Sequence, residues 1–222
     1  MERDELTGLL IDILIGRSFQ DIQLLLLKYR EQTYGRSLLA DINNGVRNQE
    51  LRYALSVSLQ HSIRDPLVPI NQMLIQRDVS DITTLLRSGD ATAIFNIFLR
   101  RTDSHILAIG MSYGMVNLDR DIDKSNSLSN TAKKVLLHAL RTAYNIPYRD
   151  AILLNESMGG SSTFRVGNDD KLSIRACRMH WARDTWNCTK LEYANITGKD
   201  FARKMGRRSG TFGALMGALA SL

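Results

Sequence analysis

The chain has 222 residues, of which 44% are hydrophobic and 23% are charged, with 29 Lys and Arg against 23 Asp and Glu. This length can bury a sizeable core, so we expect one compact domain or a solenoid of repeats. No apolar run reaches the roughly eighteen residues of a transmembrane helix, and no signal sequence is expected. A cytoplasmic protein, or one peripheral to a membrane, is therefore expected. The net charge of +6 favours an anionic partner, although scattered basic residues are also typical of an ordinary solvated surface.

The first part of the chain is predicted to form short helices. The apolar stretch Leu9–Ser18 predicts one helix. An amphipathic segment follows, in which Tyr29 comes twelve residues after Arg17. A shorter helix then closes at Asp41–Ile42. This order of elements gives a pattern that can be sought again downstream.

The stretch 61–76 interrupts the helical pattern. It contains Pro66 and Pro69, which cannot both lie inside one continuous helix. We therefore predict a linker at 61–76. A second and shorter joint is expected around Pro147, so the segments on its two sides should pack closely.

The order of the first elements recurs after the linker. Ala93–Thr102 matches Leu9–Ser18 in type and phase, and each ends in a basic residue followed by a hydroxyl residue. Tyr113 again comes twelve residues after Arg101, and a short helix again closes at Asp121–Ile122. Recurrence in one order and at one spacing predicts a helical repeat, in which each unit buries its apolar face against its neighbours.

The last part of the chain, Ala151–Leu222, is predicted to contain five short helices with an enlarged polar loop, 159–169, after the first. Tyr193 comes twelve residues after Trp181, which repeats the spacing for a third time. The terminal segment is apolar enough to be a buried helix but too short for a confident membrane span. The predicted helices are Ala151–Met158, Leu172–His180, Asp184–Tyr193 and Asp200–Met205, followed by the apolar segment 211–222.

Several segments carry a family resemblance. They include LIDILIGRSFQDI near the start, DPLVPINQ in the linker and DAILLNESMGG in the last part. The most particular is the pairing of His180-Trp181 with Arg183. With these segments the chain resembles the core of the annexins, and most of all the fungal type. The resemblance implies an all-α fold of annexin-like repeats, each of five short helices, that form a curved superhelical core.

The same resemblance implies a division of the chain. The annexin core has four repeats, and this chain covers roughly the last three, as a truncated form would. The expected parts are a partial repeat at 1–60 without its first helix, the linker at 61–76, a repeat at 77–145, and a repeat with the enlarged loop at 146–222.

The annexin pattern also implies calcium-dependent binding to acidic phospholipid. A calcium ion takes roughly six to eight oxygen ligands. In the family, carbonyls of a glycine-rich loop supply several of them and a carboxylate further along the chain completes the site. At the position of that carboxylate this chain has Ser125 in one repeat and Arg207 in the next, so the calcium sites look degenerate and binding is expected to be weak or absent. The residues that match the calcium loops are Gly89, Asp90, Gly160, Gly167, Asp169 and Asp170.

Arginine offers a second way to hold a lipid headgroup. Arg207 and Arg208 can meet a phosphate without a metal, because guanidinium groups bind phosphate in a bidentate manner. The alternative is that both are ordinary surface arginines. In the same way, Asp169 and Asp170 are explained either by metal ligation or by helix capping.

Other functions find little support in the sequence. No nucleophile elbow, phosphate-binding loop or pair of histidines at metal spacing is present, so we expect no enzyme. Cys177 and Cys188 are expected to be reduced. Aromatic residues are too few for a nucleic-acid binder. Two functions remain: peripheral binding of acidic phospholipid membranes, and a soluble helical scaffold that binds proteins.

Overall fold

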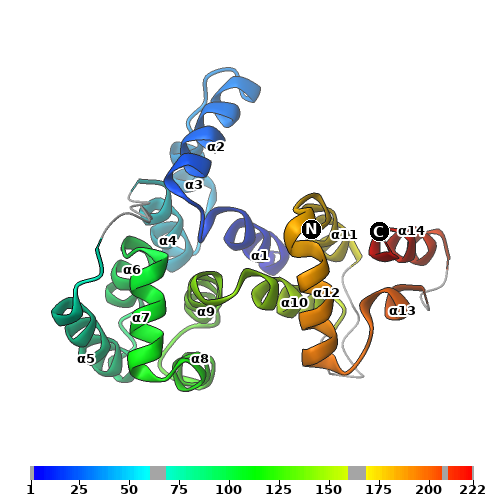
Figure 1. Ribbon diagram of the computed structural model, residues 1–222. Helices are drawn as coiled ribbons and strands as arrows, with labels where there is room; N and C mark the ends of the chain where they lie inside the picture. The colour runs from blue at the N-terminus through cyan, green and yellow to red at the C-terminus, as the bar shows by residue number, and fades with distance from the viewer. Residues whose placement is uncertain (1–2, 61–68, 160–168, 207–209, 222) are drawn as a thin grey trace. The chain divides into compact units, whose positions relative to one another are not determined.

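The fold is entirely helical in the part of the chain that the structure describes (Figure 1). The chain divides into two compact units, Met1–Tyr144 (unit 1) and Asn145–Leu222 (unit 2). The all-α class expected from the sequence is confirmed. The structure is a computed structural model, and it describes residues 3–60, 69–159, 169–206 and 210–221.

Unit 1 contains a first set of helices, α1–α4, and a middle set, α5–α9. In its core α6 packs against α4 and α9, while α7 packs against α5 and α9. Phe95, Phe98 and Ile106 are fully buried there. The helices are α1 (Arg3–Leu14), α2 (Phe19–Gln32), α3 (Leu38–Gly45), α4 (Gln49–Gln60), α5 (Gln72–Ser88), α6 (Ala91–Arg100), α7 (Asp103–Tyr113), α8 (Met115–Lys124) and α9 (Asn130–Tyr144).

The hydroxyl residues that end the two matched sequences are helix caps. The Ser18 Oγ accepts a hydrogen bond from the Asp21 N–H at 3.1 Å, and the Thr102 Oγ1 accepts one from the His105 N–H at 3.2 Å. Serine and threonine favour this position because their oxygens satisfy an N–H that has no partner within the helix. The hydroxyl therefore belongs to the next helix, and α1 ends earlier than predicted, at Leu14.

Helix α5 begins inside the stretch 61–76 that was expected to be a linker. The Asn71 Oδ1 accepts a backbone N–H from the first turn of α5 at 3.1 Å. A helix can therefore start as soon as the chain has passed Pro69, at Gln72. Residues 61–68 lie outside the described part of the chain.

In unit 1 the tyrosines that recur in the sequence tie one helix to the next. The Tyr29 Oη donates to the Asp41 Oδ2 at 2.6 Å, between α2 and α3, and the Tyr113 Oη donates to the Asp121 Oδ2 at 3.1 Å, between α7 and α8. The bonds from Tyr29 and Arg36 hold the pKa of Asp41 below its ordinary value. Burial, and then the bond to Asp121, raise the pKa of Tyr113. The recurrent spacing thus reflects a structural contact.

Unit 2 forms the last set of helices, and their order matches the prediction. Helix α12 continues to Thr197, past its expected end at Tyr193, and Gly198 ends it in the left-handed conformation with φ of 66°. Residues 160–168 and 207–209 lie outside the described residues. The helices are α10 (Ile146–Ser157), α11 (Asp169–Trp181), α12 (Arg183–Thr197), α13 (Phe201–Gly206) and α14 (Gly210–Ser221).

The core of unit 2 is built around an aromatic group. The ring of Phe201 lies edge-to-face against Trp186, with centroids 5.7 Å apart, and against Tyr193, with centroids 5.2 Å apart. These three side chains are almost fully buried. Edge-to-face pairs add to the free energy gained by burying the rings. The packing fixes α13 on α12.

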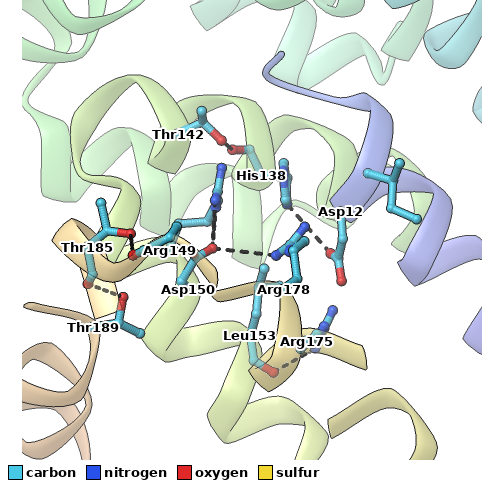
Figure 2. Close-up of polar contacts among 12 residues, drawn as sticks. Asp12, His138, Thr142, Arg149, Asp150, Leu153, Arg175, Arg178, Thr185 and Thr189 are labelled. Atoms are coloured by element: carbon cyan, nitrogen blue, oxygen red, sulfur yellow. Dashed lines mark hydrogen bonds and ion pairs between the residues drawn. The ribbon is translucent and has the colours of Figure 1, made fainter. Parts of the chain in front are cut away.

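Buried polar contacts hold α10 to α11 (Figure 2). Both the Nε and the Nη2 of Arg149 donate to the Asp150 Oδ1, at 2.8 and 2.6 Å, and the Arg178 Nη2 lies 3.7 Å from the same oxygen. Arg175, which is 2% exposed, donates to the Leu153 carbonyl at 2.6 Å. The segments around Asp150 and Arg178, which carry part of the family resemblance, therefore have a structural role in this unit.

Candidate functional site

The predicted calcium loop of the middle set is the short connection between α5 and α6. Gly89 ends α5 with φ of 76°, and its N–H donates to the Leu85 carbonyl at 2.9 Å. Asp90 starts α6, and its Oδ1 accepts the Ala93 N–H at 3.0 Å. Glycine is favoured in the first position because it tolerates positive φ, and aspartate in the second because it caps a helix. Both residues thus have structural roles in this turn.

The elbow between α8 and α9, residues 125–129, lies directly against this loop. The Ser127 Oγ donates to the Leu86 carbonyl at 2.5 Å and lies 2.9 Å from the Ser125 Oγ. A Cβ atom added to Gly89 would lie 2.6 Å from the Ser127 carbonyl oxygen. The carbonyl at the end of α5 is therefore satisfied by a hydroxyl of the protein, and the loop and the elbow are in close contact.

Several of the oxygen atoms around this loop already take part in hydrogen bonds within the protein. The loop carboxylate, Asp90, already accepts a backbone N–H, and Ser125 stands near the expected position of the second carboxylate. Asp123 is exposed in the last turn of α8. Within the described ranges, no three His, Cys, Asp or Glu side chains gather in a way that could hold a metal ion. A calcium ion needs roughly six or more oxygens.

The remaining predicted site residues belong to the last set. Asp169 and Asp170 lie exposed in the first turn of α11, where negative charge interacts favourably with the helix dipole. The structure does not bring them to any second group of acids among the described residues. Gly160, Gly167, Arg207 and Arg208 lie outside the described residues.

The elbows of the first and middle sets are joined by contacts that the sequence analysis missed. The first-set elbow, Val46–Asn48, connects α3 to α4, and the Asn48 Nδ2 donates to the Thr131 Oγ1 at 3.4 Å. Next to it, the Ser129 Oγ donates to the Glu50 carboxylate. The run of serines before α9 was the only hint in the sequence: hydroxyl residues are favoured at helix starts, so the run indicates where α9 begins. Two hydrogen bonds thus connect the two elbows to the helix starts beside them in unit 1.

Known proteins resemble this chain in sequence and in fold. No protein-family model matches it. Annexin C1 of the fungus Cryptococcus neoformans var. grubii is 29% identical over 195 residues, which cover 83% of this chain and 39% of that protein. The solved structure of an annexin A8 point mutant with an intact N-terminus superposes with a TM-score of 0.80 at 21% identity, covering 96% of this chain and 66% of that chain. The chain is a homologue of the annexins. It spans about two fifths of the length of the annexin C1 that it matches.

This annexin homologue shares its fold with calcium-loaded structures as well. Calcium-bound annexin (Sm)1 superposes with a TM-score of 0.72 at 21% identity, covering 97% of this chain and 64% of that chain. Identity this low establishes the fold alone, so the loops have to be judged on their own residues. Among the described helices, none is both long and apolar enough to cross a membrane.

Proposed function

We propose that this annexin homologue binds acidic phospholipid surfaces peripherally, and that calcium at the middle-set loop contributes little to the binding. Membrane and calcium binding are typical of annexins, and the fold is theirs. The observation that carries the second part of the proposal is the hydrogen bond from the Ser127 Oγ to the Leu86 carbonyl. Because Asp90 is also used as a helix cap, the loop has few oxygens left for an ion.

Positive charge at the end of α13 supports a direct contact with phosphate. Arg203 is exposed in the last turn of this helix, and Lys204 follows it. The sequence then continues to Arg207 and Arg208. A guanidinium at the place of the family's carboxylate repels a cation and attracts a phosphate. We therefore assign the headgroup contact to Arg207 and Arg208.

Sedimentation with phosphatidylserine-containing vesicles tests the proposal. Wild-type protein is mixed with the vesicles in calcium or in chelator, at low and at moderate salt. We expect pelleting in chelator that fades as salt increases, because exposed charges are screened. The double variant Arg207→Gln/Arg208→Gln should pellet much less. The control Lys133→Gln/Lys134→Gln removes the same charge from another adjacent basic pair and should pellet like wild type.

Each alternative gives a different pattern in this assay. Pelleting that requires calcium would show that Gly89, Asp90, Asp169 or Asp170 contributes to a working calcium site. Equal losses in the two double variants would show attraction by the overall charge, without a defined headgroup contact. Pelleting under none of the conditions would contradict membrane binding and favour a helical scaffold that binds proteins.

A further inference from the structure

We draw no further inference here: the strongest candidate, the exposed apolar positions on α2, α7 and α12 that precede each recurrent tyrosine by two residues (Leu27, Met111 and Leu191), carries nothing, because nothing in the structure shows what covers them.

Discussion

The middle and last helix sets use the same kinds of contact with different charges. In the middle set the Tyr113 Oη donates to the carboxylate of Asp121 at 3.1 Å. In the last set the tyrosine oxygen is the acceptor, because the Lys204 Nζ donates to the Tyr193 Oη at 3.0 Å. The hydroxyl can play either part, since it is both a donor and an acceptor. The contact between the third and fourth helices is thus kept while the charge of its partner is reversed.

The buried aspartates of the two sets differ in the same direction. Asp78 of α5 is bonded by the Nε and Nη2 of Arg101 at 2.8 and 3.1 Å, and by His105 at 2.9 Å. In the last set, Asp150 lies against two arginines, Arg149 and Arg178. In the last set the tyrosine is paired with a lysine in place of an aspartate, and the aspartate of the first helix lies against two arginines in place of one arginine and one histidine. The two sets therefore share the positions at which polar groups pair, while the charges of the partners differ.

The largest effect is expected from breaking the buried carboxylate of the middle set. Asp78→Asn leaves the part-buried Arg101 without the carboxylate of the buried Asp78, and breaking such a pair costs up to about 3 kcal/mol. Asp81→Asn on the same helix is the control, because its pair with Arg77 is exposed and worth about 0.5 kcal/mol or less. Urea unfolding measures both variants. Similar losses of stability for Asp78→Asn and Asp81→Asn would contradict a special role for the buried pair.

The second prediction compares two glycines with similar backbones. Gly89 in the middle set has φ of 76° and Gly198 in the last set has φ of 66°. Substitution by alanine strains either backbone, by roughly 1–2 kcal/mol. At Gly89 the new Cβ would also lie 2.6 Å from the backbone oxygen of Ser127, whereas at Gly198 it would meet nothing within 4 Å.

Gly89→Ala should therefore lower the free energy of unfolding more than Gly198→Ala, by about 1 kcal/mol or more, because packed atoms must move apart. Chemical denaturation of the two variants gives the difference directly. Equal losses would mean that the elbow at 125–129 moves away from the loop at little cost, and that the two are not firmly packed.

The third prediction concerns the reversed tyrosine bond. Lys204→Met removes this donor from the hydroxyl of the buried Tyr193, and loss of a hydrogen bond at a buried polar group costs about 1–3 kcal/mol. Tyr193→Phe removes the hydroxyl itself and lets the ammonium group turn toward water, so it should cost less. Thermal or urea unfolding ranks the two variants. A larger loss of stability for Tyr193→Phe than for Lys204→Met would show that the ammonium group cannot turn toward water and depends on the hydroxyl.

The local elements of this fold were predictable from the residues themselves, whereas contact between the loop at Gly89 and the elbow near Ser125 was expected only through the family resemblance. Ser18 and Thr102 mark helix starts because a cap is a local interaction, and the tyrosine spacing marks equivalent helices because it follows one helix length. The bond from Ser127 to Leu86 joins residues 41 apart, and the bond from Ser129 to Glu50 joins residues 79 apart. Periodicity within a helix carries no information about which loops meet.

At the candidate site, too, the position of the loop was predicted and the contacts of its atoms were not. The family resemblance predicted Gly89 and Asp90 as the calcium loop and Ser125 near the position of the family's carboxylate. It could not show that Asp90 caps α6 or that a serine hydroxyl satisfies the carbonyl at the end of α5. Both facts depend on backbone geometry. A pattern can therefore locate the loop, whereas the hydrogen bonds that its atoms make are seen only in the structure.

The smallest effect is predicted for the tyrosine contact of the first set. There the partner of the tyrosine is the carboxylate of Asp41, whereas in the last set it is the ammonium group of Lys204. Hydrogen bonds from Tyr29 and Arg36 lower the pKa of Asp41. A carboxylate with a lowered pKa stabilises the fold above its ordinary pKa, near about pH 4, and this contribution is lost as the pH falls through the lowered value. Tyr29→Phe removes the first-named bond, so its melting temperature should fall less steeply than that of wild type below about pH 4.

Lys204→Met is the control for this pH series, because its bond to Tyr193 contains no carboxylate. Its melting temperature should lie below that of wild type by a constant amount through the same acid range. Circular dichroism melts at several pH values measure all three proteins. Parallel curves for wild type and Tyr29→Phe would show that the bond between Tyr29 and Asp41 does not couple protonation to folding. The contact would then be equivalent in the first and last sets whatever the charge of its partner.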